Sequence, residues 1–114
     1  MVAEHVLETV RDYLRACVED GFPVSFGVLF GSQVTGNTHE WSDIDLIVVS
    51  PRFDRKYGHK ERGRLRVLAG RVDDRIEPIP CGLRQWETDD VSVIIEVARR
   101  EGQRIDWAEA PAPV

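Results

Sequence analysis

The segment FGSQVTGNTHEWSDIDLIVVS, residues 30–50, holds the pattern on which the fold and the function depend. Two aspartates, Asp43 and Asp45, stand one residue apart at the start of an apolar run that Pro51 follows. The β-branched residues of this run predict a strand over residues 44–50. Side chains of alternate strand residues point to the same face, so we expect both carboxylates on one face where the strand begins.

Two like charges this close repel each other and raise a pKa unless a cation lies between them. Magnesium prefers hard oxygen ligands, and it commonly binds one or two carboxylates together with water and phosphate oxygens. The pair therefore predicts a magnesium site. The alternative is structural, with Asp43 capping a turn and Asp45 solvated at a strand end, because aspartates are common in turns.

A glycine–serine pair ahead of the aspartates favours a phosphate site. Gly31 and Ser32 follow the apolar run VSFGVLF, residues 24–30, which predicts another strand. Gly31 lets the backbone approach a ligand closely, and Ser32 can cap a short helix whose free N–H groups would face a phosphate. Gly36 lets the chain turn back toward Ser42. A lone Gly-Ser pair would indicate an ordinary turn, but its combination with the aspartates is more specific.

The rest of the hydrophobic pattern predicts the element order helix, strand, strand, helix, strand, helix. The first helix presents apolar residues at intervals of three and four and ends before Gly21 and Pro23; they are Val6, Val10, Tyr13, Leu14, Cys17 and Val18. We then expect a polar loop over residues 52–62, a short helix over 61–70, a third strand over 71–80 and a final helix over 83–102. The run at 91–97 also suits a strand, but Arg99 and Arg100 before Gly102 are typical of a helix C-terminus.

The composition limits the classes of protein to consider. With 114 residues the chain suits one domain with a modest core, which we assign to residues 1–110, followed by a loose tail over 111–114. A net charge of −5 argues against general nucleic-acid binding, though not against a metal-chelated nucleotide. No signal peptide or membrane span is evident, so we expect a cytoplasmic protein. We expect Cys17 and Cys81 to be free buried thiols, with a disulfide as the alternative.

The sequence GSQVTGNTHEWSDIDLIVV, residues 31–49, resembles the signature of the DNA polymerase beta-type nucleotidyltransferase superfamily. The length and element order resemble its smallest members, the minimal nucleotidyltransferase domains. The resemblance implies an α/β (α+β) domain with a small mixed sheet backed by helices on one face. It further implies that Gly31 and Ser32 hold the triphosphate and that Asp43 and Asp45 hold two Mg²⁺ ions. A third carboxylate on a following strand would complete the metal site and help to deprotonate the acceptor hydroxyl.

Three acids are candidates for this third carboxylate: Asp73, Asp74 and Glu77. In a strand over this region Asp73 and Glu77 would share one face. We predict Glu77, which has an apolar residue on each side as the family's third acid tends to have, with Asp73 as the second choice. The family more often has Asp there. The structural alternative is a solvated edge strand whose acids pair with Arg71 and Arg75.

The resemblance also implies a reaction and a partner. Minimal members commonly work beside a small helical protein called HEPN, as the antitoxin of a toxin–antitoxin pair, and can adenylylate it. We therefore expect magnesium-dependent transfer of a nucleoside monophosphate, AMP from ATP, to a hydroxyl group on a HEPN-type partner. The sequence does not decide whether the chain also forms a homo-oligomer. The rival is an inactive binding module, favoured by Glu77 and by the absence of the arginine that many relatives carry in the loop at residues 33–35. An aminoglycoside-modifying enzyme fits less well, since its acceptor-binding domain is missing.

Further side chains have a functional and a structural interpretation. His39 would touch a phosphate or is solvated, and Trp41 would stack on the nucleotide or covers a core edge. The basic residues between 52 and 66 form a solvated face or contact the acceptor. We expect Trp86 and Trp107 to be core or interface aromatics.

Overall fold

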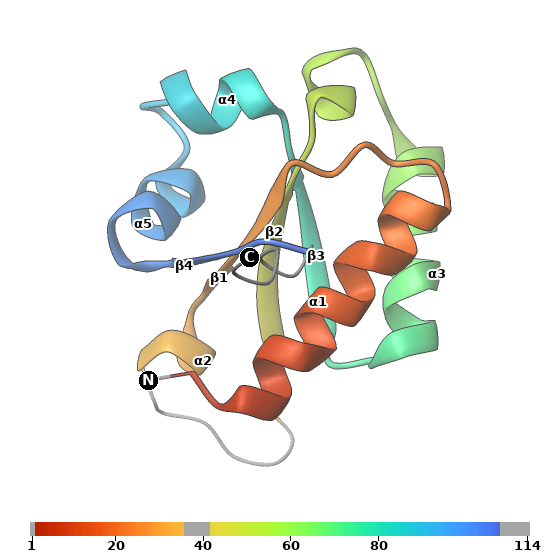
Figure 1. Cartoon of the computed structure of the whole chain (residues 1–114). Helices are drawn as coiled ribbons and strands as arrows, with labels where there is room; N and C mark the ends of the chain where they lie inside the picture. Colours follow the sequence, from red (N-terminus) through yellow and green to blue (C-terminus); the bar gives the residue numbers. More distant parts are fainter. Residues whose placement is uncertain (1, 36–41, 108–114) are drawn as a thin grey trace, which may run out of the picture.

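The computed structural model describes residues 2–35 and 42–107. Its centre is a four-stranded sheet in the order β3-β2-β1-β4 (Figure 1). β1 pairs antiparallel with β2 and β4, whereas β2 and β3 are parallel, so the predicted mixed sheet is confirmed. The strands are β1 (Phe26–Phe30), β2 (Ile44–Val49), β3 (Ile76–Cys81) and β4 (Gln103–Ile105). Gly36, His39, Trp41 and the tail at 111–114 lie outside the described residues.

One face of the sheet packs against α1 (Glu4–Glu19) and α3 (His59–Val72). The apolar stripe that predicted the first helix is buried on this face, apart from the half-buried Val18. Gly27 of β1 lets α1 approach closely, since a Cβ atom there would lie 2.9 Å from Cδ1 of Leu14. The Tyr13 hydroxyl donates a hydrogen bond to the Leu65 carbonyl at 3.0 Å and so joins the two helices.

The other face is also covered, so the expectation of helices on one face only is wrong. α4 (Leu83–Thr88) and α5 (Val93–Glu101) lie across the sheet from α1 and α3 (Figure 1). A second apolar cluster forms there around Phe26, Ile47 and Ile95. The central strands are buried on both faces because they are continuous apolar runs, which alternation cannot assign to one side.

The single helix expected over residues 83–102 is interrupted. Asp89 ends α4, and its carboxylate accepts hydrogen bonds from the backbone N–H groups of Val91 and Ser92 at 2.8 and 2.9 Å. An aspartate that satisfies backbone donors in this way competes with helix continuation. The predicted helical state of the apolar run and its end at Gly102 are confirmed.

The boundaries between residues 51 and 76 also differ from the prediction. A 3₁₀ helix (Pro51–Asp54) follows β2, and α3 begins inside the expected loop because the Glu61 carboxylate accepts the Gly58 N–H at 2.9 Å. α3 then continues through Gly70 to Val72, so β3 begins only at Ile76. β4 was not predicted, because a strand of three residues is too short to show an alternation of apolar and polar side chains.

The smaller expectations hold. Cys17 and Cys81 are buried free thiols, and burial raises the pKa of Cys17 to about 11. Trp86 packs edge-on against Phe26, and the Trp107 indole donates to the Val24 carbonyl at 2.9 Å.

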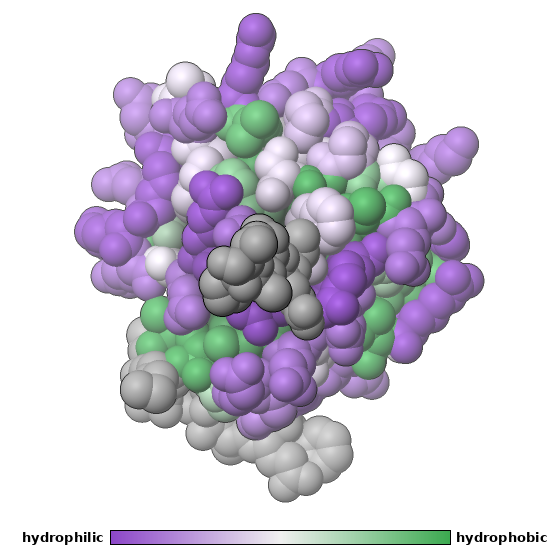
Figure 2. Space-filling view, in the orientation of Figure 1, coloured by the Kyte–Doolittle hydropathy of each residue, from purple (hydrophilic) through white to green (hydrophobic). Residues whose placement is uncertain are grey.

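Hydrophilic side chains cover most of the face in Figure 2. Within residues 2–35 and 42–107, no helix has the length and apolar content needed to span a membrane.

Candidate active site

Gly31 and Asp45 meet at the end of the β1–β2 pair. Phe30 is the register partner of Asp45, and Gly31 follows with φ of +75°, a conformation that favours glycine. A Cβ atom at Gly31 would lie only 2.6 Å from Oδ2 of Asp45. A side chain at this position would therefore strain the backbone and fill the space beside the carboxylate.

A short helix, α2 (Ser32–Thr35), leads away from Gly31. The predicted short helix is present, but Ser32 is its first residue and not the preceding residue that would cap it. Gln33 is buried, and its Nε2 atom donates to the Asp43 carbonyl at 3.1 Å. α2 is thereby tied to the backbone that enters β2.

Sequence reasoning missed this role of Gln33, which it treated only as a position without positive charge. The available signal was a long amide side chain in a loop that must return to the next strand. An amide at that position can satisfy backbone carbonyls that the sheet leaves unpaired.

Asp45 and Glu77 lie side by side, because they are register partners in the parallel β2–β3 pair. Burial, and then the charge of Asp43, raise the pKa of Asp45, while a hydrogen bond with Glu77 offsets part of the rise. The charge of Asp43, followed by burial and the charge of Asp45, raises the pKa of Glu77, and Arg66 opposes this. The three carboxyl groups predicted from the sequence therefore form one electrostatic cluster.

Asp73 and Asp74, the other candidates for the third carboxylate, are not register partners of Asp45. Asp73 caps α3 and is not part of a strand, so the shared strand face on which it was considered does not exist. Its carboxylate pairs with the Arg75 guanidinium at 2.8 Å, as the structural alternative expected. Asp74 is exposed and lines a pocket of about 220 Å³ together with Arg66 and Glu77.

The chemistry of the cluster fits magnesium. Asp43, Asp45 and Glu77 offer only carboxylate oxygens, and the bare backbone of Gly31 permits a close approach to Asp45 that no side chain would allow. In the described part of the chain, no three His, Cys, Asp or Glu side chains are grouped so as to hold a metal by themselves. Magnesium does not require such a group, since water and phosphate oxygens commonly complete its six ligands.

The basic segment between residues 52 and 66 is not one continuous surface. Arg52 pairs with Glu61 at 2.8 Å, and Arg64 pairs with Asp20. Arg62 lies over the Tyr57 ring, and the charge of Arg66 offsets part of the rise in the pKa of Glu77. Only Arg66 of these four is thus placed near the carboxylate cluster.

Comparison with known proteins shows a family and solved structures with a similar fold. No curated protein matches this chain. A solved structure described as "Crystal structure of the toxin-antitoxin with AMP-PNP" has a TM-score of 0.57 at 19% identity, over 89% of this chain and 74% of that one, which shows a shared fold. Residues 11–107 match the family model described as a nucleotidyltransferase domain. This match covers most of the chain and agrees with the signature at residues 31–49, and the protein therefore belongs to the nucleotidyltransferase domain family.

Proposed function

We propose that this protein is a magnesium-dependent nucleotidyltransferase that transfers AMP from ATP to a hydroxyl group of a partner protein. The observation that carries the proposal is the pairing of Asp45 with Glu77 across β2 and β3, beside Asp43. A strand pair that places three carboxyl groups together has no evident structural purpose, because their mutual repulsion costs stability.

The residues have distinct roles in this proposal. Asp43 and Asp45 would hold Mg²⁺, while Gly31 and Ser32 would hold the triphosphate, as the family resemblance implies. When bound, the metal would lower the pKa of the acceptor hydroxyl and offset charge on the leaving pyrophosphate. Glu77 would accept the hydroxyl proton, and Gln33 would hold the Asp43 backbone in position.

The donor and the acceptor are inferred from the family resemblance and the structural neighbour. That neighbour is described as a toxin–antitoxin with AMP-PNP, which is an ATP analogue, and this supports ATP as the donor. The same description supports a protein partner, and the resemblance to minimal members favours a HEPN-type protein as the acceptor. The chain would then act as the antitoxin.

Metal-dependent nucleotide binding provides the first test. Calorimetry with AMP-PNP should show binding that requires Mg²⁺ and is lost in the Asp43→Asn, Asp45→Asn double variant. Asp74→Asn is the matched control, because Asp74 is a nearby exposed acid outside the proposed ligand set. Equal affinity of the wild type and the double variant would refute the proposed site.

Transfer is tested by mass. The protein is incubated with ATP and Mg²⁺, alone and with a HEPN-type protein, and both chains are weighed. The proposal predicts one added AMP on the partner, dependent on Asp43 and Asp45. A contact-only antitoxin is the second candidate, favoured by a glutamate at position 77 and by the absence of an arginine at residues 33–35. It predicts a tight complex without added mass, unchanged in the double variant.

A further inference from the structure

A second pocket lies at the opposite end of the sheet from the carboxylates. Phe22 precedes β1 and Arg52 follows β2, at the end where Phe26 pairs with Val49 (Figure 1). The cavity has a volume of about 500 Å³ and is bounded by the end of α1, the 3₁₀ helix and α3. This volume is within the range of about 300–1,000 Å³ that is usual for small-molecule sites.

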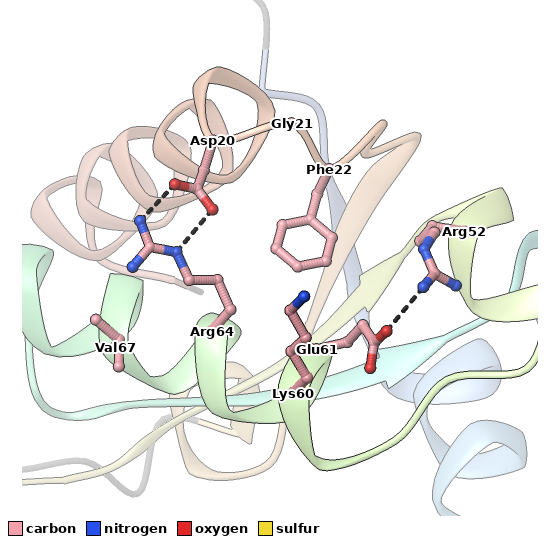
Figure 3. A pocket seen from close by; sticks show the side chains of 8 residues that line it. All are labelled: Asp20, Gly21, Phe22, Arg52, Lys60, Glu61, Arg64 and Val67. Atoms are coloured by element: carbon pink, nitrogen blue, oxygen red, sulfur yellow. Dashed lines mark hydrogen bonds and ion pairs between the residues drawn. The ribbon is translucent and has the colours of Figure 1, made fainter.

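Two apolar side chains, Phe22 and Val67, form part of the wall of this pocket. Phe22 presents its ring to the cavity, and Val67, which is 48% exposed, lies on the far side of Arg64 (Figure 3). The Phe22 ring contacts the buried Phe53 ring, with ring centroids 5.9 Å apart. An aromatic face held in this way offers a stacking surface to a flat ring.

The charges around the ring are held in place by ion pairs. Arg64 donates from Nε to Asp20 at 2.8 Å within a two-bond contact. Across the pocket, Arg52 pairs with Glu61 at 2.8 Å, and Glu61 is itself fixed by the Gly58 N–H. Each pair is neutral as a unit, and each arginine keeps N–H donors beyond those it spends on its carboxylate.

Lys60 gives the pocket its surplus charge. Its ammonium group lies between the two ion pairs beside the Phe22 ring (Figure 3). The salt bridges found among the described residues do not include Lys60. With three cationic and two anionic side chains, the lining carries a net charge of +1.

We infer that this pocket binds a small ligand that combines a flat aromatic ring with one anionic group. The ring stacks on Phe22, and the anion meets Lys60 and the remaining donors of the two arginines. The site is separate from the nucleotide site, so both can be occupied together, and the inference does not depend on the proposed function.

Naphthoate, a flat ring with one carboxylate, is the probe, and naphthamide is its neutral counterpart. We titrate naphthoate into the full chain and follow the backbone amide NMR signals. The signals of Gly21, Phe22 and Lys60 should shift, and the signal of Gly31 should stay unchanged. Naphthoate should bind more tightly than naphthamide. Equal affinity of the two compounds, or shifts centred on Gly31, would overturn the inference.

Variants test each part of the site. Lys60→Gln should weaken naphthoate binding about fivefold, the value of a partly exposed ion pair, while naphthamide binding stays unchanged. Lys56→Gln removes the same charge from a neighbouring exposed position outside the lining and should have no effect. A loss in Lys56→Gln equal to that in Lys60→Gln would show attraction by overall charge and refute a specific site.

A variant that should bind naphthoate more tightly provides a test that loss of stability cannot imitate. Asp20→Asn releases Arg64 and raises the charge of the lining, so naphthoate should bind more tightly. The Asp43→Asn, Asp45→Asn double variant should bind naphthoate like the wild type, because its changes lie at the other end of the sheet. Weaker binding in Asp20→Asn would contradict the proposed recognition of the anion.

Discussion

At the scale of single residues, Gly31 links the backbone to the chemistry. Gly31→Ala places a Cβ atom against Asp45 in a conformation that disfavours side chains, so we expect a loss of about 1–3 kcal/mol in unfolding free energy. Nucleotide binding should be lost as well. Urea unfolding and calorimetry measure the two effects. The control is Gly63→Ala, at a helical site with open space around it, which should leave binding intact and raise stability.

The identity of the third acid is a separate prediction at this scale. Glu77→Gln should reduce AMP transfer by about 100-fold or more, because a positioned general base is lost. Asp74→Asn should retain most of the activity. Transfer rates measured by the mass assay compare the variants. If Asp73→Asn abolished transfer while Glu77→Gln left it intact, Glu77 would be the wrong residue.

The sequence predicts the positions of some of these site residues better than those of others. The alternation of strand side chains predicted Asp43 and Asp45 together, because that argument needs only one strand. β2 begins only at Ile44, but Asp43 is still near enough for its charge to raise the pKa of Asp45. The neighbour relation of Asp45 and Glu77 depends on the parallel register of two strands separated by a helix, which local pattern does not contain. Gln33 acts through its own amide and a distant carbonyl, so no periodicity marks it.

At the scale of elements, Asp89 decides that α4 and α5 are two helices. Asp89→Ala removes the acceptor for the N–H groups of Val91 and Ser92, so we expect a loss of about 1 kcal/mol, as for other lost helix caps. Asp90→Ala, at the exposed neighbouring position, should change stability by less than about 0.5 kcal/mol. The free energy of unfolding in urea measures both. Equal losses would show that the turn does not depend on the Asp89 carboxylate.

Element type was predictable from the sequence where the apolar pattern was long, as in α1 and β2. Boundaries were not, because they depend on single side chains that compete for backbone groups. Glu61 starts α3 inside a polar stretch, and Asp73 ends it three residues before β3. β4 forms because β1 offers it a free edge, which is a property of the folded sheet and not of residues 103–105.

At the scale of the whole molecule, a few carboxylates outside the active site govern the response to acid. Hydrogen bonds and ion pairs lower the pKa of four of them below the ordinary value; they are Asp20, Glu61, Asp73 and Asp89. A carboxylate with a lowered pKa stabilises the fold above its unfolded pKa of about 4, and this contribution is lost as pH falls through the folded pKa. The contribution of these four groups to the free energy of unfolding should therefore be level near neutral pH and decrease below pH ~4. Asp45 and Glu77, whose pKa values are raised, act in the opposite direction, because their repulsion is relieved when they become protonated.

Asp73 allows this acid response to be assigned to one group. Its carboxylate accepts the backbone N–H and the guanidinium of Arg75, and the hydrogen bond from that side chain is the main cause of its lowered pKa. Asp73→Asn should be less stable than the wild type at pH 7, and the difference should shrink toward pH 2 as the wild-type carboxylate becomes protonated. Urea unfolding at several pH values measures the difference. Glu8→Gln, on the exposed face of α1, should follow the wild type throughout. A stability difference for Asp73→Asn that stayed constant from pH 7 to pH 2 would show that the contribution of Asp73 does not arise from its charge.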